Sequence, residues 1–198
     1  MSIQAASRFL LGALVANEAL TAVERQTQRT NQYQRALARA RLTGRKLLVV
    51  GAPQGGIYTA IMPSYGCGDV CVDLEGCGNC PVQLHHDITK PLPFPNNSMV
   101  VFESCVLELV SDPWRGWNEM QRVAGSPENF FMARVQPNTL TAGFYPGAQW
   151  SLDIPRSAEQ TSSIGATRDA PIMRKVDTQR DTSIAMIGLL LLGSFWPK

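Results

Sequence analysis

The pattern of apolar and polar positions divides the chain into a long helical arm, a strand-rich body and two further segments. Residues 2–42 contain no proline and one glycine. Alanine, leucine, glutamine and arginine dominate there, and all four are good helix formers. Apolar residues are dense from Phe9 to Val23 and sparse after that. The pattern predicts a helical arm over residues 1–42, which suits either an interfacial helix or a helix that packs on a partner.

The next part of the chain alternates short apolar runs with helical stretches. Leu47 to Val50 is an uninterrupted apolar run that ends at Gly51, which is typical of a buried strand of a parallel sheet. Strands that alternate with helices indicate an α/β domain, predicted over residues 43–155. The other predicted strands are residues 69–73, 82–86, 99–103 and 130–135, and the predicted helices are residues 57–62 and 114–123.

Two segments of opposite character follow this domain. Residues 156–181 are rich in Ser, Thr, Gln, Arg and Asp without apolar periodicity, which predicts a polar linker. Residues 182–198 include an uncharged apolar run from Ile184 to Trp196, which predicts a hydrophobic tail helix. That run would reach about 20 Å as a helix, against roughly 30 Å for a hydrocarbon core. Contact with a membrane surface and burial in a partner protein both fit the tail.

Charge is distributed unevenly along the chain. The 198 residues carry a net charge of +2. Residues 1–46 hold eight basic and two acidic side chains (net +6), and residues 47–155 hold four and ten (net −6). Residues 156–198 hold six and four (net +2). Because the arginines of the arm are spread along a helix, we expect a solvated face there and no nucleic-acid partner.

The most specific signal is an ordered set of motifs between residues 46 and 135. The first predicted strand leads into Gly51-Ala-Pro-Gln-Gly55-Gly56, the second ends at Asp73 and the third leads to Asp87. Three phrases follow: LPFPNNSMVV from Leu92, VLELVSDP from Val106 and EMQRVAG from Glu119. In order and spacing the set resembles the class I S-adenosylmethionine-dependent methyltransferases, in their small-molecule branch, over about 90 residues.

The resemblance implies a Rossmann-like doubly wound methyltransferase-type sheet with a cofactor at the carboxyl ends of its central strands. Gly51, Gly55 and Gly56 would let the backbone approach the cofactor closely. Asp73 would accept hydrogen bonds from the ribose hydroxyls, and Asp87 would lie beside the adenine amino group. Two simpler interpretations stay open: Asp73 as a turn residue at a strand end, and Asp87 as the acceptor of an Asx-turn with Thr89.

Two positions depart from the family pattern. Val49 stands where the family has an acidic residue, and Pro53 stands where it has the second glycine of the loop. Pro53 lacks an N–H and fixes φ near −65°. The resemblance therefore leaves two functions: a membrane- or assembly-associated methyltransferase that uses S-adenosylmethionine, or a catalytically inactive structural subunit of a large assembly such as a membrane-containing virion.

Cysteine provides a second candidate site. Cys67, Cys71, Cys77 and Cys80 fall within 14 residues, and Cys77-Gly-Asn-Cys80 has the spacing of a zinc knuckle. Four thiolates would make a zinc site and, as a third function, a zinc-binding interaction module. Disulfides and free thiols are the alternatives, and free thiols are favoured because no signal peptide is recognisable.

Location and partners follow from the two appendages. We expect other protein subunits to bind the arm and the tail, with a membrane surface as a further partner of the tail. The expected location is intracellular or on a particle, peripheral to a membrane.

Overall fold

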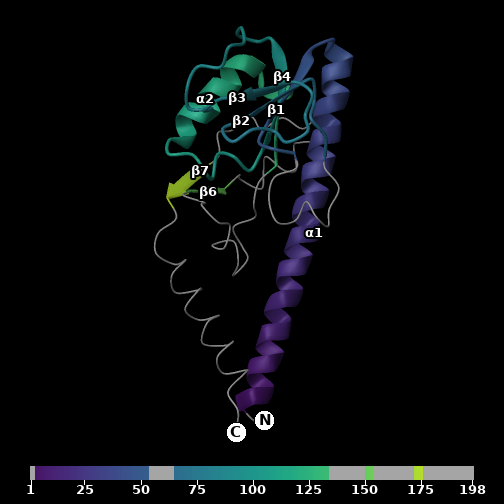
Figure 1. Cartoon of the computed structure of the whole chain (residues 1–198), viewed down its shortest axis with the longest axis vertical. Helices are drawn as coiled ribbons and strands as arrows, with labels where there is room; N and C mark the ends of the chain where they lie inside the picture. The colour runs from purple at the N-terminus through teal and green to yellow at the C-terminus, as the bar shows by residue number, and fades with distance from the viewer. Residues whose placement is uncertain (1–2, 54–64, 134–149, 154–171, 176–198) are drawn as a thin grey trace.

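The computed structural model describes residues 3–53, 65–133, 150–153 and 172–175 (Figure 1). Helix α1 leads into an α/β body, and a short two-stranded sheet follows it. In chain order the elements are α1 (Ile3–Thr43), β1 (Lys46–Val50), β2 (Val70–Asp73), β3 (Gln83–His85), β4 (Met99–Ser104), α2 (Pro113–Ala124), the 3-10 helix η2 (Pro127–Asn129), β5 (Phe130–Ala133), β6 (Trp150–Asp153) and β7 (Ile172–Lys175).

The body is a five-stranded parallel sheet in the order β3-β2-β1-β4-β5. Each predicted strand of the body is found, and the α/β prediction is confirmed at this level. The order is consistent with a Rossmann-like, doubly wound sheet, in which the chain winds outward from a central strand in both directions. The predicted helix over residues 57–62 and the predicted hydrophobic tail lie outside the described residues. Strand β7 falls within the predicted polar linker and pairs antiparallel with β6.

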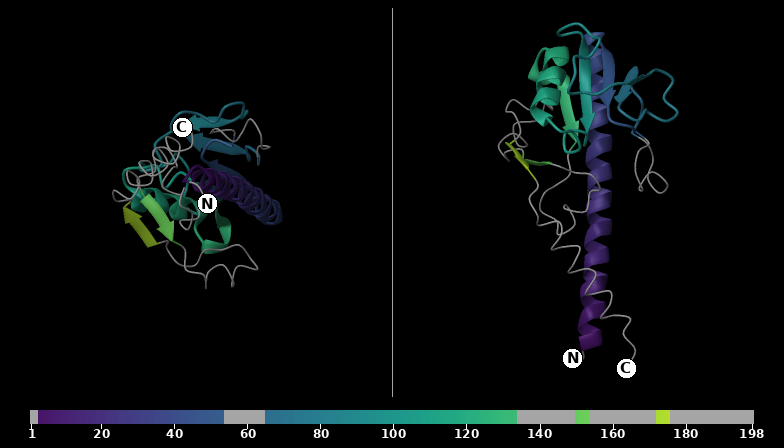
Figure 2. Two further views of the ribbon diagram at one scale, coloured as in Figure 1. Left: turned by 90° about the horizontal axis from the view of Figure 1, so that it is seen from below. Right: turned by 60° about the vertical axis from the view of Figure 1, so that its left-hand side comes forward.

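Helix α1 covers one face of the sheet with its C-terminal part only. Tyr33, Ala36 and Ala40 are buried against the side chains of β1 and β4 that point to this face. The ring of Tyr33 meets that of Phe102 edge-on at a centroid distance of 5.8 Å. Beyond this contact, toward its N-terminus, α1 continues well past the sheet (Figures 1 and 2). The arm is therefore one continuous helix. Its C-terminal part covers the sheet, and its N-terminal part projects beyond the sheet.

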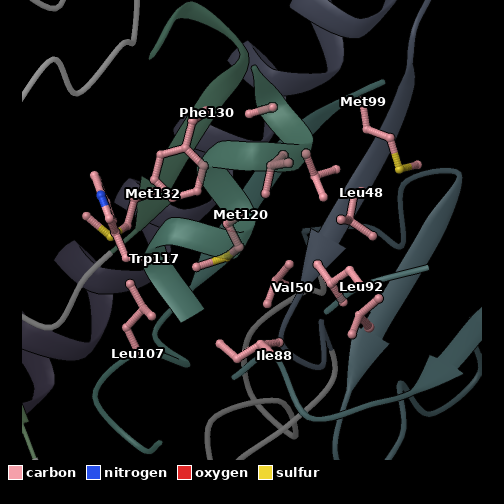
Figure 3. Close-up of a cluster of buried hydrophobic side chains, with 14 residues drawn as sticks. Leu48, Val50, Ile88, Leu92, Met99, Leu107, Trp117, Met120, Phe130 and Met132 are labelled. Atoms are coloured by element: carbon pink, nitrogen blue, oxygen red, sulfur yellow. The ribbon is translucent and has the colours of Figure 1, made fainter. Parts of the chain in front are cut away.

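Helix α2 covers the opposite face. The Asp112 carboxylate caps its first turn by accepting from the Arg115 N–H at 3.1 Å, and Pro113 occupies the first turn. Gly125 ends the helix in the left-handed conformation (φ 72°). Between these caps α2 buries Trp117 and Met120 against the sheet, with Trp117 edge-on to Phe130 at 4.9 Å (Figure 3).

A single arginine of α2 holds the loop between β3 and β4. The Arg122 guanidinium donates to the backbone oxygens of Leu92 (3.1 Å) and Phe94 (2.9 Å). It also donates to a carboxylate oxygen of Glu119 (2.9 Å), while the other oxygen of Glu119 accepts from the Leu92 N–H. The planar fork of an arginine is needed to bind all these acceptors at once.

Replacing this arginine by lysine tests the loop anchor. We expect Arg122→Lys to lower the free energy of unfolding by about 1–2 kcal/mol, since one ammonium group cannot replace the whole set of charge-assisted bonds. The matched control is Arg115→Lys on the same helix, whose pair with Asp112 is largely exposed and should change stability by less than about 0.5 kcal/mol. Urea unfolding of both variants measures the difference, and equal losses would contradict the anchor.

Candidate functional site

The sheet reverses its winding direction between β1 and β4, and ligands of such sheets bind outside the carboxyl ends of the strands at this point. Val50 at the end of β1 is in register with Val72 of β2 and with Glu103 of β4. The segments that follow these three strands therefore meet at one edge. Gly51 follows β1 directly and Asp73 is the last residue of β2, so both of these predicted site residues lie at this edge.

Gly51 brings the loop after β1 close to the loop after β4. Its φ is +99°, in the region that favours glycine. A Cβ here would lie 2.6 Å from a methyl group of Val106 and 3.0 Å from the backbone oxygen of Ser104. The fold itself requires glycine here, because both close neighbours belong to the chain, and the predicted role of Gly51 toward a cofactor stays a prediction. Gly55 and Gly56 lie outside the described residues.

Asp73 ties two loops together at this edge. One carboxylate oxygen accepts from the Ala52 N–H at 3.0 Å, and the other accepts from the Glu75 N–H at 2.9 Å. Both interpretations of Asp73 remain compatible with this geometry, because a carboxylate offers about four acceptor positions and two are used here. The structure thus brings Gly51, Ala52 and Asp73 together at one edge of the sheet, and the predicted roles of Gly51 and Asp73 toward a cofactor stay predictions.

Asp87 forms the Asx-turn that was the simpler interpretation of this residue. One of its carboxylate oxygens accepts from the Thr89 N–H (2.9 Å) and from the Thr89 hydroxyl (2.8 Å). The backbone hydrogen bond, followed by that from the hydroxyl, lowers the pKa of Asp87. It follows β3, which β2 separates from β1 in the sheet.

The four clustered cysteines form two disulfides, so the predicted zinc site is wrong. Cys67 pairs with Cys80 and Cys71 pairs with Cys77, at Cα–Cα distances of 5.5 and 6.1 Å. Within the described ranges no group of three or more His, Cys, Asp or Glu side chains could hold a metal ion. The expectation of free thiols is also wrong for these four. The spacing of Cys77 and Cys80 suggested that these two residues bind one metal ion together. Each instead forms a disulfide with a cysteine that lies earlier in the chain, Cys67 before β2 or Cys71 within it.

A buried polar cluster at the end of β4 was missed by sequence reasoning. Its members are Arg29, Tyr65, Glu103, Ser104, Cys105 and Glu108. Glu103 accepts from the backbone N–H groups of Val106 (2.6 Å) and Leu107 (3.2 Å) through one oxygen. Its other oxygen is buried without a hydrogen-bond partner. A glutamate at the end of a strand that is otherwise apolar was the available signal.

The environment of this cluster favours the protonated forms of Glu103, Cys105 and Tyr65. Burial raises the pKa of Glu103 well above its ordinary value, and the neighbouring Glu108 raises it further. Burial likewise raises the pKa of the Cys105 thiol to about 12 and raises that of the Tyr65 phenol. Cys105 is therefore a poor nucleophile, because the thiolate is the reactive form.

Comparison with known proteins does not place the chain. No family model matches the chain, and no match was found among curated proteins or solved structures. Within the described residues, no helix combines the length and the apolar character that a membrane span requires.

Proposed function

We propose that the chain is a methyltransferase-like protein whose α/β domain binds S-adenosylmethionine at the carboxyl ends of β1 and β2. One observation carries the proposal: the parallel order β3-β2-β1-β4-β5 places Asp73 beside the loop after β1, at the edge where such sheets bind nucleotides. The motif set between residues 46 and 135 supports the same assignment.

The described residues fit the ribose end of this cofactor. Asp73 is partly exposed and has free acceptor positions for two hydroxyl donors. The cofactor would supply an activated methyl group, and the role of the chain would be to bind and orient it. No acidic side chain lies on β1 to meet the amino-acid end of the cofactor. Val49, which stands at the acidic position of the family pattern, is fully buried against α1.

A structural subunit is the second candidate, and specific contacts favour it. Asp87 is engaged in a local turn, Val106 fills the space beside Gly51, and both oxygens of Asp73 bind the backbone. The contacts of each of these residues are explained by the stability of the fold, without any ligand. A fold can be retained when its ligand site is lost.

Titration of the full-length chain with S-adenosylhomocysteine tests the proposal. We expect micromolar binding that Asp73→Asn weakens by about 10–100-fold, since an amide replaces a charge-assisted acceptor of the ribose hydroxyls. Asp69→Asn is the matched control. Like Asp73, Asp69 accepts a hydrogen bond from a backbone N–H group, that of Leu47 in β1, at 2.7 Å. Asp69 lies at the amino end of the sheet, away from the proposed site.

The two variants separate binding from folding. Both variants weaken hydrogen bonds from a carboxylate to backbone N–H groups, two at Asp73 and one at Asp69, so both should lose stability, whereas affinity should fall only in Asp73→Asn. The absence of binding to the unmodified chain at millimolar ligand would overturn the cofactor proposal and leave the structural subunit. Equal weakening by both variants would exclude direct ribose recognition by Asp73.

A further inference from the structure

Figure 2 shows the part of α1 that projects beyond the sheet, and the side chains of this part include an exposed apolar stripe. Three large side chains on it are mostly exposed: Phe9 (72%), Leu20 (70%) and Val23 (57%). Four small residues on the same face are exposed as well, namely Gly12, Ala13, Ala16 and Ala19. At about 100° per residue these seven positions span one face roughly 120° wide. We call them the α1 stripe.

The α1 stripe is separate from the surface that α1 uses to cover the sheet. Tyr33, Ala36 and Ala40 make that contact, from the opposite end of the helix. Their positions in the helical repeat also point to a different side of α1. Exposed apolar patches of this kind mark sites where a protein meets a partner.

The sizes of the side chains indicate what kind of partner fits. Phe9 and Leu20 stand at either end of a flat central section made by Ala13 and Ala16. A Cβ added at Gly12 would meet nothing within 4 Å, so the centre of the stripe is open. Small residues let two helices approach closely, whereas they add little apolar area for contact with lipid. The pattern therefore favours a helix as the partner.

The pattern is also self-complementary. When a second copy of α1 runs antiparallel, Phe9 can face Leu20 of the second copy while Ala13 faces Ala16, so that large meets large at the ends and small meets small in the centre. A symmetric pair of this kind uses the same surface on both chains. Spacings of four and three residues along Phe9, Ala13, Ala16, Leu20 and Val23 match the seam of a two-helix pair.

Charge permits the same arrangement. The arm is basic, with a net charge of +6 over residues 1–46 (eight basic and two acidic side chains), so two copies repel unless their contact face is neutral. No charged residue falls on the α1 stripe. By the same count of about 100° per residue, Arg8 borders the stripe roughly 20° beyond Ala19, and Arg29 lies on the far side of the helix.

We propose that the α1 stripe is the surface through which two copies of this chain associate. A standard interface uses roughly 20–30 residues on each partner. The stripe lies within about 15 residues of helix, so the expected dimer is weak to moderate, with a dissociation constant in the micromolar range. This inference does not depend on the proposed cofactor.

Sedimentation equilibrium of the full-length chain tests the dimer. The double variant Ala13→Glu, Ala16→Glu places like charges at the centre of the seam and keeps good helix formers there. We expect it to raise the dissociation constant at least 100-fold, while circular dichroism shows unchanged helix content. The control is Leu10→Glu, Val15→Glu, which adds the same charge and removes larger apolar groups at exposed positions outside the stripe.

Each outcome decides for or against the α1 stripe. A change of less than about fivefold in the control, beside the loss in the stripe variant, supports association through this face. A monomeric unmodified chain at 100 micromolar overturns the proposal. Equal weakening by both variants also overturns it, since general apolar or lipid-like contact would then be the cause. Unchanged association in the stripe variant places the interface elsewhere.

Discussion

Reduction of the two disulfides should lower the free energy of unfolding by about 3 kcal/mol or more. The bond between Cys67 and Cys80 closes a loop of 13 residues, and that between Cys71 and Cys77 lies inside the same loop. In the loop-entropy view such a bond stabilises the fold by restricting the unfolded chain, by roughly 3 kcal/mol for a 15-residue loop. Cys71, Cys77 and Cys80 are also buried, so the bonds form part of the core.

Thermal unfolding with and without tris(2-carboxyethyl)phosphine measures this effect. The double variants Cys67→Ala, Cys80→Ala and Cys71→Ala, Cys77→Ala separate the two bonds, and the longer loop is expected to contribute more. Counting thiols in denaturant without reductant is the direct check. One reactive thiol, from Cys105, is expected, because it is the free cysteine of the described residues. Five reactive thiols would contradict the pairing.

The two disulfides determine the redox conditions under which the chain keeps its full stability. Disulfides persist in oxidising surroundings and are rare where glutathione keeps thiols reduced. Lasting retention of the two bonds would therefore require oxidising surroundings. The bonds brace the connection between β2 and β3, which runs from Leu74 to Val82 without a helix.

The strands of the body were predictable because their signal is local. An apolar run such as Leu47 to Val50 must be buried on both faces, and only a covered parallel sheet does so. The pairing of the cysteines was not predictable, since spacing alone does not show which side chains a strand and a loop bring together. The burial of Ala36 and Ala40 was equally hidden, because alanines in a helix of mostly polar sequence give no sign of the surface that the helix covers.

The candidate site was predictable only in part, for a related reason. Asp73 and Gly51 could be placed at the same edge because parallel strands end together. The hydrogen bonds that Asp87 accepts come from Thr89, two residues later. The sequence allows this turn but does not show whether it forms. The burial of Glu103 had only one signal in the sequence, its place at the end of an apolar strand, because the packing of α1 and the loop after β4 around it is not visible there.

The buried carboxyl group of Glu103 should make the fold less stable as pH rises. Its pKa is raised in the folded chain by burial and by Glu108, from an ordinary value of 4.5 that the unfolded chain retains. Above pH 4.5 the folded chain therefore binds more protons than the unfolded chain, and the free energy of unfolding falls with pH until the raised pKa is passed. One such group contributes a slope of up to about 1.4 kcal/mol per pH unit.

Glu103→Gln should remove most of this slope. Glutamine keeps the oxygen that accepts from Val106 and Leu107, and it cannot ionise. Urea unfolding between pH 5 and 8 should then show similar stability for the variant and the unmodified chain at pH 5, and a growing advantage for the variant above it. Glu128→Gln is the control, since Glu128 is exposed and its ion pair with Arg39 is loose (3.7 Å).

Parallel pH profiles for the unmodified chain and Glu103→Gln would show that the carboxyl group is ionised or hydrated in the folded state. A flatter pH profile for Glu103→Gln than for the unmodified chain would instead show that Glu103 is a neutral acid in the folded state. This acid lies at the end of β4, beside the point where the winding direction of the sheet reverses. A neutral acid there can donate a hydrogen bond as well as accept one. The same substitution therefore distinguishes a cluster that only completes the core from one that keeps a proton at the edge where ligands of such sheets bind.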